Sequence, residues 1–428
     1  MQDTVCCGCS LVCDDVAVVV QNGKLASLGL CKLGHEYCGA ALNPARLTKP
    51  LLGKDGGSQS PTSVERALDA AQMLLTGSKR PLLYGWSSSA SEVVRLGLEL
   101  ARRVHGVFDS SASLEYGDLL THHLTGGEAQ QVSLDEVRNR GEHIVYWGVN
   151  PAESHHRHAS RFTVFPKGDQ IPEGRESRTI SVIDIRKTES MRLANHQLIL
   201  NPVEGDVQLL SALLKEVQGT GGATPDTVAG VPAIEFLSFA KSLRDADYVA
   251  IFYGNGLIQA PHAAKSLPLL VQLVAALSTK KRRCVTLPMV AYSNTVGAVT
   301  ACQASAKQSF AVDFASNPPK PHAGAVKGLV AGEFDAALIV GMDALSLLPG
   351  PAAHALRQLP IVSLGVLPSV TSASARVVIP TGLTGAEAGG TTARMDGTTV
   401  ALAPFHTPPA GVATEEQVLS ELVKRLPK

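Results

Sequence analysis

Short, almost uninterrupted apolar runs recur along this chain and are separated by segments with helical spacing. Strands covered on both faces have this composition, whereas a strand with one solvent-exposed face alternates apolar and polar residues. Between the runs, stretches such as 206–219 repeat their apolar residues at the period of an amphipathic helix. The alternation predicts a Rossmann-like α/β fold with parallel sheets. The runs are 81–86, 143–148, 178–185, 248–254, 335–341, 360–365 and 375–380.

The length of 428 residues is enough for two or three domains. Residues 1–50 carry six of the eight cysteines, and two apolar runs around Asn22-Gly23 predict a β-hairpin there. The glycine-rich segment 53–63 is typical of a linker, and the segment 219–227 marks an internal boundary. We therefore predict a Cys-rich β segment over 1–50, an α/β domain over 51–218, and a second α/β domain with a C-terminal return segment over 219–428.

Two patterns of the capping-box type predict where the first helices begin. Thr62 is followed three residues later by Glu65, and Ser89 by Glu92. In this pattern the hydroxyl oxygen of the first residue accepts a hydrogen bond from a backbone N–H in the first turn of the helix.

Charge and cysteine usage exclude several classes of protein. Basic and acidic residues both number 38, so the chain lacks the field that a nucleic-acid or anionic-membrane binder uses. The first residues, with an acid at Asp3, do not form a signal peptide, and the longest apolar run, near 267–277, is too short to cross a bilayer. Closely spaced cysteines in a long chain without a secretion signal favour metal ligation in a reducing cytoplasm over disulfides.

The sharpest chemical signal is the spacing of Cys6, Cys9, Cys13 and Cys31. Two and three residues separate the first three, and Cys31 returns from across the predicted hairpin. Four thiolates arranged in this way suit a [4Fe–4S] cluster or a Cys₄ zinc site, and the asymmetric spacing favours iron–sulfur. Metal-free thiols are the remaining alternative. Cys7 and Cys38 are spare, and Cys284 and Cys302 have the apolar surroundings of core residues.

Small polar loops follow several predicted strands. In open α/β sheets ligands bind beyond the carboxyl ends of the strands, where glycines allow close backbone approach and acids accept from ribose hydroxyls. Together the loops indicate nucleotide-like or pterin-dinucleotide binding, although each one alone resembles an ordinary βα turn. They are 85–89, Gly148 and Asn150, Asp184 with Arg186 and Thr188, Gly254 with Asn255 and Gly256, and 341–343.

A histidine-rich loop follows one of these strands. It holds His155, His156 and His158 beside Arg157 and Arg161. A zinc site is one interpretation, but no further zinc motif accompanies the histidines. An anion-binding or interface loop is the favoured one.

Ordered blocks along nearly the whole chain resemble the B subunit of formylmethanofuran dehydrogenase, a member of the molybdopterin oxidoreductase superfamily. The resemblance implies a cysteine cluster that passes electrons and strand-end loops that hold a tungsto- or molybdopterin dinucleotide. Gly148, Asn150, Asp184, Arg186 and Thr188 would then line one half of that cofactor, and Gly254, Asn255 and Gly256 part of the other. The blocks are 6–16 with 29–35, 144–168 with 178–188, 287–298, 311–319 and 382–397.

The chain departs from the family pattern at 108–118. Aligned residue by residue, the metal-ligating cysteine or selenocysteine falls on Glu115. A carboxylate is a hard oxygen ligand and a thiolate a soft one, so this exchange predicts the loss of sulfur-ligated metal chemistry. The β-barrel that clamps the pterin in this superfamily is also missing after Arg394, and we expect the pterin dinucleotide to be absent.

Because it lacks both the metal-ligating cysteine and the β-barrel, the chain resembles the B subunit of the bacterial formyltransferase/hydrolase complex. The resemblance implies a redox-inactive scaffold in methanofuran- and tetrahydromethanopterin-linked one-carbon metabolism. Its partners would be an amidohydrolase-type A subunit, a C subunit and a formyltransferase subunit. One alternative is an active tungsten or molybdenum subunit that interconverts CO₂ or formate with formylmethanofuran. Another is an unrelated nucleotide-binding protein with a zinc knob.

Overall fold

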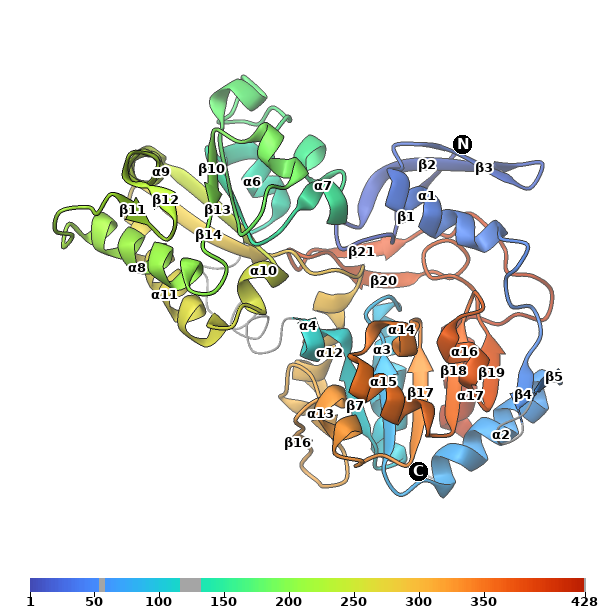
Figure 1. Ribbon diagram of the computed structural model, residues 1–428. Helices are drawn as coiled ribbons and strands as arrows, with labels where there is room; N and C mark the ends of the chain where they lie inside the picture. The colour runs from blue at the N-terminus through green and yellow to red at the C-terminus, as the bar shows by residue number, and fades with distance from the viewer. Residues whose placement is uncertain (54–57, 116–131, 427–428) are drawn as a thin grey trace. The chain divides into compact units, whose positions relative to one another are not determined.

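Figure 1 shows the computed structural model of the chain, which describes residues 1–53, 58–115 and 132–426. The chain divides into two compact units, each with its own sheet and core. Unit 1 comprises residues 1–118 and 291–428, and unit 2 comprises residues 119–290. This division differs from the predicted boundaries at 51 and 219, because strands from both ends of the chain join one sheet in unit 1.

The main sheet of unit 1 is parallel at its centre and antiparallel at its edges. The predicted apolar runs 81–86, 335–341, 360–365 and 375–380 all become central strands. Within the described residues the strand order is β16 (Lys320–Pro321), β15 (Val312–Asp313), β7 (Val107–Ser110), β6 (Pro81–Gly85), β17 (Ala336–Val340), β18 (Ile361–Gly365), β19 (Val377–Pro380), β4 (Leu51–Gly53) and β5 (Gln59–Pro61). Strands β7, β6, β17, β18 and β19 are mutually parallel.

Helices cover both faces of this sheet, which explains why its central strands are apolar throughout. Leu83, Leu338 and Val362 point to one face and pack against α2 (Val64–Gly77), α3 (Ser91–Arg103), α12 (Thr295–Ala306) and α17 (Glu415–Arg425). Their neighbours Leu82 and Ile339 point to the other face. That face packs against α13 (Ala325–Val330), α14 (Ala344–Leu347) and α15 (Gly350–Arg357). A shorter helix, α16 (Val370–Ser374), precedes β19.

The N-terminal residues of unit 1 form a separate three-stranded antiparallel sheet. It consists of β1 (Gln2–Cys6), β2 (Cys13–Gln21) and β3 (Lys24–Leu28), followed by α1 (Lys32–Gly39) and η1 (Ala40–Leu42). Asn22 and Gly23 connect β2 and β3 with φ values of 52° and 70°. The predicted hairpin turn is thereby confirmed, since such turns need φ above zero at both central residues. A further pair, β20 (Gly390–Ala393) and β21 (Thr399–Leu402), lies near the C-terminus.

Unit 2 is built on a five-stranded parallel sheet. Its order is β10 (His196–Ile199), β9 (Thr179–Asp184), β8 (His143–Trp147), β13 (Tyr248–Tyr253) and β14 (Arg283–Pro288). One face packs against α8 (Gly205–Gln218), α9 (Ala233–Asp245) and α11 (Ala263–Leu277), so the apolar run near 267–277 is a core helix. The remaining elements are α6 (Leu134–Arg140), α7 (Pro151–Ser154), η3 (Ala159–Thr163), η4 (Gly174–Ser177), η5 (Glu189–Leu193), α10 (Asn255–Ile258), β11 (Thr227–Val228) and β12 (Val231–Pro232).

Each parallel sheet contains a point at which the strand order reverses direction. In unit 1 the chain runs outward from β6 to β7 on one side and from β17 to β19 on the other. In unit 2 it runs from β8 to β10 on one side and from β13 to β14 on the other. At such points the loops at the strand ends diverge and leave room for a ligand. The mixed α/β fold with parallel sheets therefore agrees with the sequence prediction.

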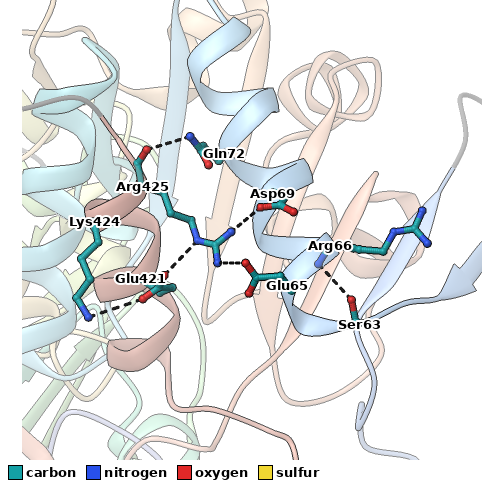
Figure 2. A network of polar contacts seen from close by, with 8 residues as sticks. All are labelled: Ser63, Glu65, Arg66, Asp69, Gln72, Glu421, Lys424 and Arg425. Carbon is teal, nitrogen blue, oxygen red and sulfur yellow. Dashed lines mark hydrogen bonds and ion pairs between the residues drawn. The ribbon is translucent and has the colours of Figure 1, made fainter.

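The last helix of unit 1 is tied to α2 by a network of charges, which Figure 2 shows. Arg425 on α17 lies 2.6 Å from both Glu65 and Asp69 on α2, and 3.2 Å from Glu421 on its own helix. Gln72 donates to the Arg425 carbonyl at 2.9 Å. One arginine thus joins helices from the two sequence segments that make up unit 1.

The two predicted capping residues are each displaced from the observed helix start. The N-cap of α2 is Ser63, whose hydroxyl accepts the Arg66 N–H, and not Thr62. The N-cap of α3 is Ala90, so Ser89 does not cap that helix. Among the described residues, no helix has the length and apolar character needed to cross a membrane.

Candidate functional site

Three backbone elements of unit 1 carry the four predicted ligand cysteines. Cys6 ends β1, Cys13 begins β2, and the two residues are partners across the antiparallel pair. Cys9 lies in the loop between these strands, and Cys31 is the N-cap of α1. The first three are buried and Cys31 is partly exposed. Strand pairing therefore positions the group, together with the first turn of one helix.

The loop supplies backbone N–H groups to two of the sulfurs. The N–H of Gly8 donates to Cys6 Sγ at 3.4 Å, and the N–H of Leu11 donates to the Cys9 sulfur. Both donors lie two residues after the sulfur that they reach. Such bonds favour a thiolate over a thiol, as metal ligation requires. A Cβ on Gly34 would lie 2.9 Å from Cys6 Sγ, so glycine lets α1 approach the sulfur closely.

The thiols influence one another electrostatically. Burial raises the pKa of Cys9 far above its ordinary value, the Leu11 N–H lowers it, and the neighbouring thiols of Cys13, Cys6 and Cys31 raise it again. A metal ion or cluster of positive charge reverses such a shift. Over residues 1–53, 58–115 and 132–426, no three His, Cys, Asp or Glu side chains are arranged to hold a single metal ion. The donor set itself is soft sulfur throughout, which fits an iron–sulfur group.

The other four cysteines are buried, and Cys7 is close enough to Cys6 and Cys9 to interact with them electrostatically. Cys7 and Cys302 belong to the core of unit 1, and Cys284 belongs to the core of unit 2. Burial raises the pKa of Cys284 to about 12. Cys284 and Cys302 act as small apolar groups, while the Cys7 sulfur also has a hydrogen bond with Ser293.

Glu115, which the sequence analysis expects at the position of the family's metal-ligating cysteine, ends the short helix α4 (Ser111–Glu115). Its Oε2 is buried and has no hydrogen-bond partner among the described residues. Burial raises the pKa of this carboxyl to about 7. Besides burial, the charge of Glu115 raises the pKa values of Tyr84 and Tyr292, so both phenols lie near it. The residues that follow, 116–131, lie outside the described part of the chain.

A second buried carboxyl, which the sequence analysis did not single out, fixes the start of α4. Asp109 ends β7 and accepts hydrogen bonds from the Ser110 and Ala325 N–H groups at 2.8 and 2.7 Å. The Ser113 hydroxyl and the Ala311 N–H complete its shell at 2.7 and 3.1 Å. Burial raises the pKa of Asp109 to about 6, and these bonds oppose the rise. Asp109 is therefore a fully satisfied structural anchor, in contrast to Glu115.

In unit 2, two predicted loops meet at the reversal point of the sheet. Gly148 follows β8, and Gly254 and Gly256 follow β13. The Gly254 N–H donates to the Trp147 carbonyl at 3.1 Å, and the Gly256 N–H to the Gly148 carbonyl at 2.9 Å. A Cβ on Gly148 would lie only 2.5 Å from the Leu257 nitrogen. These glycines therefore allow the backbone of the loop after β8 to pack against the backbone of the loop after β13.

Asn150 is occupied by contacts within unit 2. Its amide nitrogen donates to Glu189 Oε2 at 2.9 Å, and its amide oxygen accepts the Ser190 hydroxyl at 2.6 Å. The side chain thereby joins the loop after β8 to η5. Asn255 begins α10, directly after Gly254.

The third predicted loop follows β9, the neighbour of β8. Asp184 Oδ1 accepts the Arg186 N–H at 3.2 Å, which closes a local turn. Arg186 is exposed, while Thr188 is buried and its hydroxyl has no partner among the described residues. Asp184 thus ends β9, Arg186 and Thr188 follow it, and Gly148 and Asn150 follow the neighbouring strand β8.

The histidine-rich loop does not bring its three histidines to one metal-binding point within the described residues. His155 is buried, with its Nε2 3.0 Å from the Val290 carbonyl oxygen and its Nδ1 2.8 Å from the Ser154 hydroxyl. His158 is buried against Phe252, and its Nδ1 lies 3.0 Å from the Tyr146 hydroxyl. Burial lowers the pKa of His155 to about 4. These two histidines are neutral core residues.

Two curated proteins match the chain over almost its full length. One is the B subunit of the tungsten-containing formylmethanofuran dehydrogenase 2 of Methanocaldococcus jannaschii, which is 29% identical over 100% of this chain and 98% of its own length. The other is the subunit of the same name from Methanococcus maripaludis, which is 27% identical over 99% of this chain and 98% of its own. No family model matches the chain.

Two solved structures share its fold. One chain of the crystal structure of the formyltransferase/hydrolase complex FhcABCD from Methylorubrum extorquens, solved with methylofuran, has a TM-score of 0.67 at 21% identity. The match covers 88% of this chain and 98% of that one. Acetylene hydratase from Pelobacter acetylenicus also has a TM-score of 0.67, at 13% identity, covering 99% of this chain and 69% of that one. At these identities the likeness establishes the fold.

Proposed function

Because this chain is a full-length relative of the formylmethanofuran dehydrogenase B subunit, we propose that it is the B subunit of a formyltransferase/hydrolase complex and carries no tungsten or molybdenum redox chemistry. In this proposal a formyltransferase subunit passes a formyl group from a tetrahydromethanopterin carrier to methanofuran or an analogue. The amidohydrolase-type A subunit then adds water across the N-formyl bond, which releases formate and the free amine. Our chain, with the C subunit, supports that assembly in the cytoplasm.

Glu115 is the observation that carries this proposal. Its carboxyl stands at the position of the family's soft metal ligand, and burial raises its pKa to about 7, so near neutral pH a large fraction is protonated. A protonated carboxyl is a poor ligand, and even the carboxylate prefers hard cations. Hydrolysis of a formyl carrier transfers no electrons, so a subunit in such a complex has no need of the metal.

The glycine loops of unit 2 are consistent with the absence of a pterin dinucleotide. Gly148 and Gly256 are needed for the contact between their own backbones, and Asn150 is engaged by Glu189 and Ser190. Their presence therefore does not require a bound cofactor. We propose that the pterin-binding function of these loops has been lost while their packing role remains.

We also propose that Cys6, Cys9, Cys13 and Cys31 hold a [4Fe–4S] cluster in a structural role. Buried soft donors with N–H···S bonds support this assignment. The cluster would cross-link β1, β2 and α1.

The same cysteines favour the second candidate, an active tungsten or molybdenum subunit, because an electron relay is of use only to a redox enzyme. Elemental analysis of the native complex separates the two. We expect formate production from the formyl carrier with neither tungsten nor molybdenum bound. Stoichiometric tungsten or molybdenum in that complex would establish the second candidate instead.

A further inference from the structure

Two glycines that are far apart in the sequence let the first turn of α1 pack closely against the cysteine loop of unit 1. A Cβ on Gly8 would lie 3.0 Å from the Leu33 carbonyl oxygen and 3.2 Å from both the Cα and the nitrogen of Gly34. A Cβ on Gly34 would lie 2.9 Å from Cys6 Sγ and 3.0 Å from Leu30 Cδ2. Neither glycine has the positive φ that by itself favours glycine. Both positions are therefore restricted by space, and at Gly34 the nearest atom is the sulfur of Cys6.

Glycine is otherwise unfavourable at Gly34. This residue is the third of α1, where alanine is the better helix former. It is also buried, so a methyl group there would be removed from water, which is favourable. Gly34 lacks both contributions, and the atom that alanine would displace first is the sulfur of a predicted cluster ligand.

The helix α1 has its N-terminus at the same sulfur. Cys31 is its N-cap without a capping side-chain hydrogen bond, and the first turn contains no acidic residue. Backbone N–H groups at the start of a helix carry a partial positive charge. Cys6 is only 6% exposed, and its sulfur lies beside the third residue of this helix. A thiolate-ligated cluster, which is an anion, is therefore stabilised by the adjacent first turn of α1.

We propose that Gly34 is a positioning residue of the cluster site, because its missing side chain lets the Cys6 sulfur lie against the first turn of α1. This inference rests on the proposed [4Fe–4S] cluster and adds to it a residue that binds no metal itself. Reduction makes a cluster more negative, so the N–H groups of this turn favour the reduced form and raise the reduction potential. Gly8 acts on the same distance, because it lets the cysteine loop approach α1.

The test compares Gly34→Ala with Gly39→Ala in the full-length chain, isolated in its complex without air. Gly39 is the last residue of the same helix, and a Cβ there meets no atom within 4 Å. We expect Gly34→Ala to lower the iron bound per folded chain at least twofold and to shift the reduction potential of the remaining cluster to more negative values. Gly39→Ala should change neither quantity.

Two outcomes count against the proposal in different ways. Equal iron content and equal reduction potential in Gly34→Ala and Gly39→Ala would overturn the positioning role and leave the cluster assignment intact. An unchanged chain that binds no iron would overturn the cluster assignment, and the positioning role with it.

Gly8→Ala separates the space for the sulfur from the effect of the helix. The nearest atoms to its added methyl group belong to Leu33 and Gly34, so this variant moves α1 away from the loop. It should therefore keep its iron and still shift the reduction potential to more negative values. The same variant decides the question if Gly34→Ala fails to fold. A Gly8→Ala cluster with the potential of the unchanged chain would refute the stabilising role of the helix.

Discussion

Cys6 and Cys13 are cross-strand partners, with the last residue of β1 opposite the first residue of β2. The strand register is irregular between Thr4 and Cys6, and the loop that follows includes Val12 at a φ of 42°. A branched residue in this left-handed region is strained, and such strain persists only where the surroundings impose it. The strand pairing and this strained loop therefore fix the backbone positions of Cys6, Cys9 and Cys13.

Cys9→Ser should remove bound iron from the native complex and leave formate production unchanged. Serine keeps the size of the side chain but replaces a soft donor by a hard one. Iron content and the visible absorption of the complex measure the first effect, and a formate assay measures the second. Cys302→Ser, a buried cysteine in the core of unit 1, should keep its iron. A variant that assembles normally yet makes no formate would show that the cluster takes part in the reaction.

Glu115→Gln should stabilise the chain at pH 8 and have little effect at pH 5. The pKa of Glu115 is about 7 in the folded chain and 4.5 ordinarily. Between these two pH values the folded state therefore binds more protons than the unfolded state. Stability is therefore lost as the pH rises through this window, by roughly 2 kcal/mol after allowance for partial exposure. Urea unfolding at the two pH values measures the difference. Glu416→Gln, at an exposed site, should show no such dependence, and equal effects of Glu115→Gln at both pH values would contradict the assignment.

His155 should destabilise the folded chain in acid. Burial lowers its pKa to about 4 from an ordinary 6.5, so in this range the unfolded state binds the extra proton. Stability falls as the pH drops from 6.5 towards 4, by up to about 3 kcal/mol from this residue. His155→Gln remains neutral throughout and should flatten the decline, whereas His354→Gln, on the surface of α15, should not. Parallel pH profiles for His155→Gln and the unchanged chain would argue against a neutral buried imidazole.

The sheet strands could be predicted from the sequence because their cause is local composition. The run 248–254 is apolar throughout, and the structure buries every residue of β13. The division of the chain could not be predicted in this way. It depends on β19 pairing with β4, more than 300 residues earlier, and no local pattern encodes such a partner. The segment 219–227 looked like a boundary because glycines and threonines form any surface connection, and here it connects α8 to β11 inside unit 2.

Some of the site residues could likewise be predicted from the sequence, and others could not. The spacing of Cys6, Cys9 and Cys13 predicts a common site, since short loops limit where the sulfurs can go. The structure couples these thiols electrostatically, but no three of the described side chains are arranged as ligands of one ion. Gly34 gave no such signal, because only the fold reveals that the Cys6 sulfur lies beside it. Ser89 was interpreted as a cap, but its hydroxyl lies instead near the Glu415 carboxyl, which follows it by more than 300 residues.

Gly148→Ala should destabilise unit 2 more than a positive φ alone explains. Its φ is 59°, and an added Cβ would lie 2.5 Å from the Leu257 nitrogen and 2.8 Å from the Gly256 carbonyl carbon. Gly219→Ala is the matched control, because its φ is 68° with nothing within 4 Å of the added Cβ. We expect about 1 kcal/mol for Gly219→Ala and about 3 kcal/mol or more for Gly148→Ala. Urea unfolding measures both, and similar losses would mean that the two loops separate easily.

Arg425→Gln should destabilise unit 1 by about 1 kcal/mol, because it leaves three carboxylates without their shared cation (Figure 2). Its neighbour Lys424 is the control, since it is 73% exposed and its one ion pair in the described part of the chain is with Glu421, at 3.7 Å. Lys424→Gln removes the same charge from the same turn and should cost less than about 0.5 kcal/mol. Unfolding in low salt and in 0.5 M salt tests the origin of the effect, because screening weakens an ionic network. A loss in Arg425→Gln that is independent of salt would assign the contribution to packing of the arginine stem against α2.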